Sequence, residues 1–264
     1  MELRGTQFAG GDVMDNIPAR APYQGLMQIF DYNRPFYLRT AAGVMAAVYV
    51  SMYQPLALRV LILAAVGLAV VWTCSSLLVS HYVYDRSGLY RLSWLPGCLS
   101  RRPERWINLH AGVDESSLAM HSLFPGSEGQ TIDIYDPCKM TAPSIKRARR
   151  VSGVSLLPAH PQTLPALDGG FDTAFLIFAA HELRDHQDRV RLFQEIARVL
   201  RIGGELVLVE HLRDWANFLA FGPGFLHFFS KRCWETATGS AGLTIRLRAT
   251  VTPFVHVFVL QRQR

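Results

Sequence analysis

Side chains suited to proton transfer follow two apolar runs in the second half of the chain. His181-Glu182-Leu183-Arg184 follows the run FDTAFLIFAA, and His211-Leu212-Arg213 follows the run ELVLVE. Imidazole has an ordinary pKa near ~6.5, so His181 and His211 are candidate general bases. Glu182 is a candidate catalytic partner that orients them. These residue types predict acid–base chemistry.

A metal site is the alternative use for histidines that lie near carboxylates. The histidines here follow separate apolar runs, and they lack the His-x-x-x-His spacing of a helical metal site. The four cysteines show no Cys/His spacing suited to zinc and are expected to be reduced thiols. The sequence therefore predicts no metal site.

The elements that must position these histidines alternate between strand-like and helix-like runs after Pro103. Strands are expected at RWINLHA, TIDIYD, VSLL, FDTAFLIFAA and ELVLVE, and a helix is expected from Asp188 to Leu200, with Gly203-Gly204 as its stop. This rhythm predicts an α/β fold with a mostly parallel sheet. The last two runs, TIRLRATV and HVFVLQR, are close enough to form an antiparallel hairpin.

Two uncharged stretches precede this domain. Thr40 to Leu58 carries no charge, and neither do the 21 residues from Val60 to Ser80, which is long enough for a helix to cross the ~30 Å hydrocarbon layer. With a tight turn at Gln54-Pro55, they predict a transmembrane helical hairpin. A buried helical pair inside a soluble fold is the alternative.

The predicted domain organisation follows from this hairpin. We expect an N-terminal cytosolic segment at residues 1–35, the hairpin at 36–83 and a catalytic domain at 84–264. Arginines flank both outer ends of the hairpin, which predicts that both termini face the cytoplasm, from an inner (cytoplasmic) membrane crossed more than once. The lipid bilayer is thus an expected partner.

The net charge of +6 raises the question of an anionic partner. Lys and Arg are scattered, apart from two clusters, and no stacking aromatic residues interleave with these clusters, so nucleic acid is not expected. The larger cluster, in SIKRARR, is either a solvated helix face or a surface that lies against anionic lipid head groups.

The stretch from Leu164 to Asp214 resembles class I S-adenosylmethionine-dependent methyltransferases. It has an L-P dipeptide before an F-D pair and a buried strand, then a helix that ends near R-I-G-G and another apolar strand. The whole chain is similar to bacterial members with two N-terminal membrane spans, through HAGVDESS, MTAPSIKRAR, AHELRD and EHLRDWANFLAFGPGFLHFFS. The resemblance implies a Rossmann-like, seven-stranded, mostly parallel sheet with an antiparallel last strand.

The resemblance also implies residues that hold the cofactor, S-adenosylmethionine. The places of the family's first motif are taken here by Asn108, His110, Gly112 and Asp114. An acid at the end of the second strand binds the ribose hydroxyls in this class, and Asp136 is assigned that role, with a simple turn at Asp136-Pro137 as the alternative. His160 and Ala180 are assigned to the same site. His110 has the alternative role of supporting the loop.

The acceptor side is expected in the aromatic segment after the fifth strand. Gly222-Pro223-Gly224 breaks any single helix there, and Phe221 and Phe225 are expected to contact an apolar substrate. Arg184 and Arg213 are expected to bind a polar head of that substrate. The predicted function is methyl transfer to a hydrophobic, membrane-partitioned small molecule. A catalytically silent, membrane-tethered scaffold is the alternative, because the first motif is altered. Methylation of a protein at the membrane is a third possibility; it would be expected to use an acidic groove, and the sequence shows none.

Overall fold

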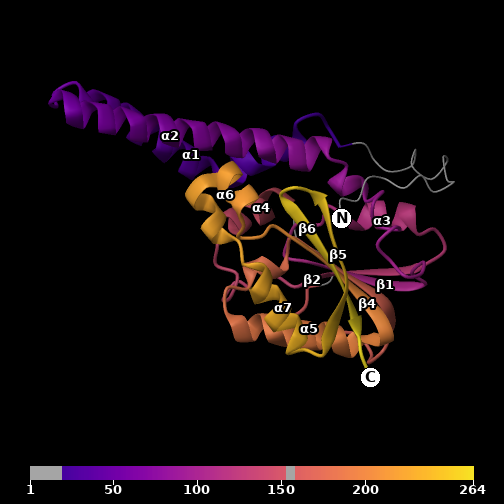
Figure 1. Cartoon of the computed structure of the whole chain (residues 1–264). Helices are drawn as coiled ribbons and strands as arrows, with labels where there is room; N and C mark the ends of the chain where they lie inside the picture. Colours follow the sequence, from indigo (N-terminus) through magenta and orange to yellow (C-terminus); the bar gives the residue numbers. More distant parts are fainter. Residues whose placement is uncertain (1–19, 153–157) are drawn as a thin grey trace.

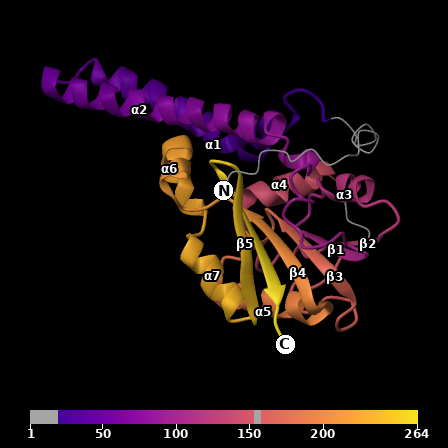
Figure 2. The ribbon, with the colours of Figure 1, turned by 45° about the vertical axis from the view of Figure 1, so that its right-hand side comes forward.

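The computed structural model describes residues 20–152 and 158–264. Its N-terminal part is a pair of long helices, α1 (Gln24–Ser51) and α2 (Leu56–His81), joined by a short turn at Met52–Pro55. The two helices lie side by side across one end of the α/β domain and extend well beyond it, as Figures 1 and 2 show. A helical pair with a turn is present as predicted, but α1 begins at Gln24 rather than at Phe36, and the prediction that both helices cross a membrane is not supported, since α2 is the one candidate span in the described part of the chain.

The hairpin is not buried in the protein. Among the described residues, the helix from Leu56 to Arg91 is the one that is long and apolar enough to cross a membrane, judged by length and composition, and none of its most apolar window is buried. Leu61 and Leu78, for example, are 67% and 70% exposed. The alternative of a buried helical pair therefore does not describe α2.

The domain contains a six-stranded sheet in the order β2-β1-β3-β4-β6-β5. The first four strands in the sequence are parallel, and β6 runs antiparallel to both of its neighbours. The strands are β1 (Arg105–His110), β2 (Glu128–Asp133), β3 (Phe171–Ile177), β4 (Leu200–Glu210), β5 (Leu243–Thr252) and β6 (Val255–Arg262).

Short helices connect these strands. The turn η2 (Tyr82–Arg86) continues α2, and η3 (Leu89–Arg91) follows it. The remaining helices are α3 (Ser117–Leu123), α4 (Pro143–Ser152), η4 (Ala180–Glu182), α5 (His186–Val199), α6 (Trp215–Phe221), η5 (Gly222–His227) and α7 (Lys231–Gly239).

Each face of the sheet has its own apolar core, because successive side chains of a strand point to opposite faces. Phe175 of β3 packs with Trp106 in a cluster that includes Leu92 and Trp94 from the segment after η2. The next residue, Leu176, belongs to the opposite cluster with residues of α5 and α7. Covering both faces explains why β3 is an uninterrupted apolar run, as the sequence pattern indicates.

Three details of the predicted fold differ from the structure or are untested. The expected helix stop at Gly203-Gly204 lies inside β4, because α5 already ends at Val199 and the next residue is extended. The sheet has six strands in the described part of the chain, not seven. The run VSLL, predicted as a strand, lies outside the described residues, and Pro158 just after it forms an isolated parallel bridge with Asp133 of β2.

Two contacts among residues 20–152 and 158–264 illustrate how the hairpin is attached to the domain. Arg147 of α4 donates from Nε to the carbonyl oxygen of Tyr32 in α1, at 2.6 Å. On the other side, the ring of Trp72 in α2 packs against Phe218 of α6, with 5.5 Å between ring centroids. Trp72 also fills the space beside Gly222, where an added Cβ would lie 2.5 Å from the indole ring.

Gly222→Ala is expected to weaken this attachment. Gly222 has a φ of +53°, and its Cβ would collide with Trp72, so we expect about 1–3 kcal/mol of destabilisation beyond the backbone strain. The measurement is the free energy of unfolding of the detergent-purified protein. Gly242→Ala is the control, because Gly242 also has a positive φ but has open space beside it. If both variants lost the same free energy of unfolding, the role of the Trp72 contact would be contradicted.

Candidate functional site

The carboxyl ends of the parallel strands open toward the hairpin. Because β1 has β2 on one side and β3 on the other, the chain reverses its winding direction between β1 and β3, which is where sheets of this type bind ligands. A cavity of about 800 Å³ lies there, between the strand ends and the two long helices. Its lining includes Phe36, Ala69 and Trp72 from the hairpin and Phe178 and His211 from the strand ends.

The loop after β1 is held together by its own polar side chains. Nδ2 of the buried Asn108 donates to Ser116 and Ser117, while Oδ1 of Asp114 accepts from the backbone N–H groups of the same two serines. The Gly112 N–H donates to Nδ1 of His110 at 3.2 Å. His110 and Asp114 therefore shape the turn, which agrees with the supporting role weighed for His110.

The acid at the end of the second strand is Asp133, not Asp136. Asp133 is the last residue of β2 and is 1% exposed, whereas Asp136 lies three residues further on, in a turn where it accepts from the Cys138 N–H. The apparent alternation of TIDIYD misplaced the strand end. Arg149 of α4 donates to Asp133 at 2.6 Å, so its guanidinium occupies one carboxylate oxygen.

The other residues assigned to the cofactor lie around this end of the sheet. His160 is half exposed, with its Nε2 3.4 Å from Asp136. Ala180 is fully buried at the start of η4. Ala180 is thus buried next to the cavity residue His181 in the sequence without lining the cavity itself, and His160 lies beside the turn that holds Asp136.

His181 lies between two carboxylates. Its Nδ1 is 2.8 Å from Oε2 of the buried Glu210, and its Nε2 is 3.4 Å from Oε1 of Glu182. Burial opposes protonation of this ring, but the charges and hydrogen bonds of Glu210 and Glu182 outweigh it and raise the pKa of His181 to about 10. A protonated His181 has no lone pair for a proton, so the geometry does not favour the predicted general-base role.

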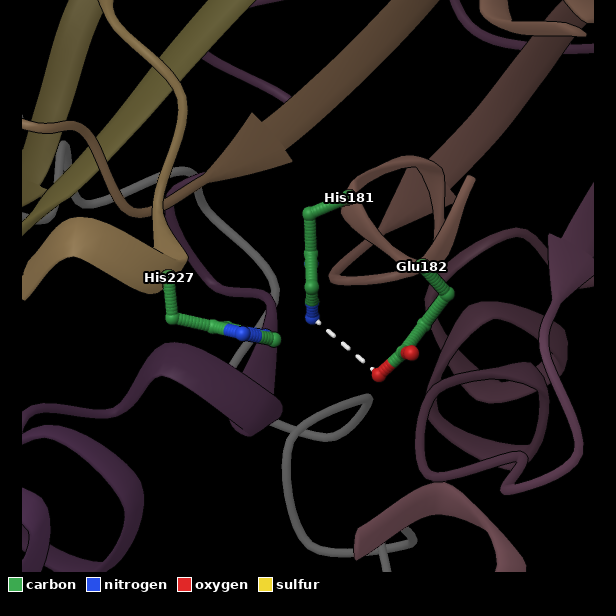
Figure 3. Close-up of side chains that lie close together, drawn as sticks. All are labelled: His181, Glu182 and His227. Carbon is green, nitrogen blue, oxygen red and sulfur yellow. Dashed lines mark ion pairs between the residues drawn. The ribbon is translucent and has the colours of Figure 1, made fainter. Parts of the chain in front are cut away.

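His227 joins this pair from the segment after α6. Figure 3 shows the side chains of His181, Glu182 and His227 entering one small space from three sides. One ligand-type atom from each of the three lies within 4.8 Å of the others. The sequence spacing argued against a metal site, but it could not detect residues that the fold brings together over 45 positions.

His211 has a different environment. Its Nδ1 lies 2.8 Å from the carbonyl oxygen of Phe254, and its Nε2 lies 2.8 Å from the Tyr84 hydroxyl. Because a carbonyl only accepts, Nδ1 carries the proton, and Nε2 accepts from Tyr84. Burial lowers the pKa of His211 to about 4, and the positive charge of His181 adds to the effect. His211 is therefore neutral, and Tyr84 stands at its accepting nitrogen.

Phe178, directly after β3, adopts a left-handed backbone conformation with a φ of +50°. Its ring stacks on His211 with centroids 5.0 Å apart, and it also contacts Tyr84. A bulky residue in this conformation is strained, and such strain is typical of binding sites. The stacked ring holds the imidazole of His211 in one orientation at the cavity wall.

The residues assigned to the substrate divide into two groups. Phe221 lines the cavity, whereas Phe225 packs on Phe218, with centroids 5.1 Å apart, and is not part of the lining. Arg184 donates to the carbonyl oxygen of His227, and Arg213 donates to those of Leu226 and Phe228. Both arginines thus hold the backbone around η5, which differs from their predicted contact with a substrate head group.

Sequence reasoning missed four residues of this site. They are Tyr84, Asp133, Arg149 and His227. Arg149 was considered only as part of the basic cluster SIKRARR. The signal for Asp133 was present, because an acid follows the β-branched pair Thr131-Ile132, but the second acid in the same run concealed it. No local pattern marks His227.

Comparisons with known proteins agree with this fold. Residues 117–208 match a family model described as a methyltransferase domain. The uncharacterized methyltransferase YcgJ of Bacillus subtilis is 29% identical over 111 residues, which are 42% of this chain and 42% of YcgJ. The chain therefore matches less than half the length of this curated relative.

Two solved structures have the same fold. An S-adenosylmethionine-dependent methyltransferase from Aquifex aeolicus aligns with 67% of this chain and 93% of its own, at 16% identity and a TM-score of 0.51. The PH0226 protein from Pyrococcus horikoshii aligns with 67% of this chain and 91% of its own, at 18% identity and a TM-score of 0.50. The domain thus has the α/β fold of these two structures. Residues 117–208 match a methyltransferase domain, and the fold is that of a solved S-adenosylmethionine-dependent methyltransferase.

The loop after β1 and the end of β2 fit this cofactor in part. Gly112 has a φ of +102°, which lets the backbone turn closely there, and the side chain of Arg149 occupies the space beside it. Oδ1 of the buried Asn108 has no hydrogen-bond partner among the described residues. Both oxygens of Asp133 are engaged here, Oδ2 by Arg149 and Oδ1 by the Tyr135 N–H, so a ribose-binding role would require the Arg149 contact to open.

The low pKa of His211 predicts a pH-dependent stability. In the unfolded chain, His211 binds a proton below about pH 6.5, whereas in the folded protein it stays neutral down to a pH of about 4. The free energy of unfolding therefore falls as the pH is lowered. We expect a loss of about 2 kcal/mol between about pH 7 and about pH 5. The groups that face His211 are the Tyr84 hydroxyl, the Phe254 carbonyl and the charges of His181 and His256.

The measurement is denaturant unfolding of wild type and His211→Gln at both pH values. The variant has no titrating group at position 211. The difference in pH dependence between the two proteins therefore gives the contribution of His211 alone, because the other histidines are the same in both. The same pH dependence in both would contradict a buried, neutral His211.

Proposed function

We propose that this protein transfers the methyl group of S-adenosylmethionine to a hydrophobic small molecule that reaches the site from the membrane. The observation that carries the proposal is the cavity of about 800 Å³ shared by the hairpin and the strand ends. One wall consists of residues of α1 and α2, both apolar ones such as Phe36, Leu68 and Trp72 and polar ones, and the other holds His181, Glu182 and His211. An apolar acceptor in this cavity would be in contact with the polar groups of the strand ends.

The hairpin supports a membrane source for the acceptor. The exposed apolar surface of α2, together with that of Met45 and Tyr49 on α1, is costly in water and suits a lipid bilayer. We propose that α1 and α2 anchor the protein in the cytoplasmic membrane, with both termini and the domain on the cytoplasmic side. The cavity then lies next to the membrane surface.

The chemistry requires alignment more than covalent participation. When bound, S-adenosylmethionine supplies an electrophilic methyl group on a positively charged sulfur. The protein has to hold the nucleophile in line with that group and exclude water, which the apolar cavity walls do. If the acceptor carries a proton, Tyr84 is placed to receive it while passing its own proton to Nε2 of neutral His211, 2.8 Å away.

One observation favours the second candidate function, a catalytically silent scaffold. Arg149 is bonded to Asp133, the carboxylate that would hold the ribose. If this ion pair does not open, the domain cannot take the cofactor in the usual way. Cofactor binding therefore separates the two functions.

Asp133→Asn is expected to weaken binding of S-adenosylmethionine and S-adenosylhomocysteine by roughly 10- to 100-fold, because a charged acceptor for two hydroxyls is lost. The measurement is titration calorimetry on the detergent-purified protein. Asp136→Asn is the matched control, three residues away and directed into a turn, and it should bind as wild type does. Absence of binding by folded wild-type protein would support the scaffold instead.

Ala69→Phe is expected to reduce methylation of apolar acceptors by filling the cavity from α2, with cofactor affinity unchanged. The measurement is transfer of labelled methyl groups to extracted lipids, quinones and apolar thiols or amines. Ala64→Phe is the control, because Ala64 is on the same helix but exposed and outside the lining. Equal activity in the two variants would show that the acceptor does not use this cavity.

A further inference from the structure

The side chains of His181, Glu182 and His227 form a cluster with the composition of a transition-metal site. Two imidazoles and one carboxylate are a ligand set that binds Zn²⁺ in metalloenzymes. They come from two separate segments, η4 and the end of η5, and meet at the wall of the cavity. Figure 3 shows that the three side chains converge on one space rather than lying along a surface.

The distances fit coordination after a small movement. Nε2 of His181 and Oε1 of Glu182 are 3.4 Å apart. Two ligands of a tetrahedral Zn²⁺ with bonds near 2.0–2.1 Å are separated by about 3.3 Å, so this pair already has the required spacing. The ligand atoms of all three residues lie within 4.8 Å of one another, so the His227 ring has to approach by only about 1–1.5 Å.

A second observation points to a ligand at this place. Glu182 is 8% exposed, and its Oε2 has no hydrogen-bond partner among the described residues. A buried carboxylate oxygen without a partner is costly, and a cation beside it would remove that cost. Glu182 and Glu210 are two carboxylates around His181. Their combined negative charge would balance that of a divalent cation.

Glu210 completes the arrangement as an orienting residue. It accepts from the backbone N–H of His181 at 3.2 Å and lies 2.8 Å from Nδ1 of the same ring. A carboxylate bonded to one ring nitrogen directs the other nitrogen outward, and this is the usual support of a metal-binding histidine. Nε2 of His181 is consequently directed toward Glu182 and His227.

We propose that His181, Glu182 and His227 bind a divalent transition metal ion of the Zn²⁺ type, and that the fourth coordination position opens into the cavity. With three protein ligands, the remaining position is free for water or for a ligand atom from the cavity. This inference does not need the cofactor, and it predicts metal binding by the protein alone.

The position of the metal has a consequence that rests on the proposed function. His181, Glu182 and His227 would hold the ion, which would lower the pKa of a thiol or hydroxyl group on an acceptor in the cavity, and that proton would pass to the Tyr84–His211 pair. The deprotonated sulfur or oxygen would be the stronger nucleophile toward the sulfonium methyl group. The substrate class is thus an apolar molecule with one such coordinating group.

The test is titration of the full-length, detergent-purified protein, prepared without a polyhistidine tag, with Zn²⁺ and with Co²⁺. We expect one equivalent to bind, with the intense visible absorption of four-coordinate Co²⁺. His227→Gln and Glu182→Gln should weaken binding at least about tenfold, and Glu210→Gln by roughly 10- to 100-fold. The control is His160→Gln, because His160 is also paired with a carboxylate, Asp136, but has no third ligand.

The outcomes separate the two proposals. No saturable binding by folded wild-type protein, or binding that His227→Gln and Glu182→Gln leave unchanged, would overturn the metal site, whatever the cofactor titration gives. Metal binding without methyl transfer to any acceptor would leave the site intact and count against the proposed function. A long-chain alkanethiol should change the Co²⁺ spectrum if the fourth position is open, and an unchanged spectrum would contradict that part.

Discussion

The contact between the helical hairpin and the carboxyl ends of the parallel strands determines the rest of this structure. The strands β1, β3 and β4 all end at the same edge, and α1 and α2 cover that edge. Trp72 can approach closely because Gly222 has no side chain, and Arg147 of α4 holds α1 from the other side. Without these contacts the strand ends would be open to water, and no apolar cavity would adjoin the polar residues.

Within that edge, the two histidines that look equivalent in the sequence have opposite properties. Both follow a parallel strand, but His181 lies between Glu182 and Glu210, while His211 has a carbonyl and a phenol as partners. Carboxylates favour the charged imidazole and burial favours the neutral one. One histidine is therefore suited to hold positive charge or a metal ion, and the other to accept a proton through Tyr84.

Much of the fold was predictable, because it follows from local patterns. Long uncharged runs indicated the two helices, buried apolar runs indicated β3 and β4, and the short separation of the last two runs indicated the antiparallel pair. The residues at which the strands end were harder to predict. Asp136 was preferred to Asp133 because alternation in TIDIYD continues past the point where β2 leaves the sheet.

The site was predictable only where it follows the strands directly. His227 and Arg149 come from helical segments whose position depends on packing over the whole domain, which no spacing in the sequence records.

The length of α2 has a consequence for where an acceptor would enter. A helix of 26 residues is about 39 Å long, which exceeds the ~30 Å hydrocarbon layer by roughly two turns. On the proposed orientation, the surplus lies at the domain end, near Ser80 and His81. The cavity residues of α2, from Ala65 to Ser80, would then run from the acyl chains of the cytoplasmic leaflet to the membrane surface. An acceptor dissolved in one leaflet could thus diffuse sideways between the helices and the domain, without first leaving the bilayer for water.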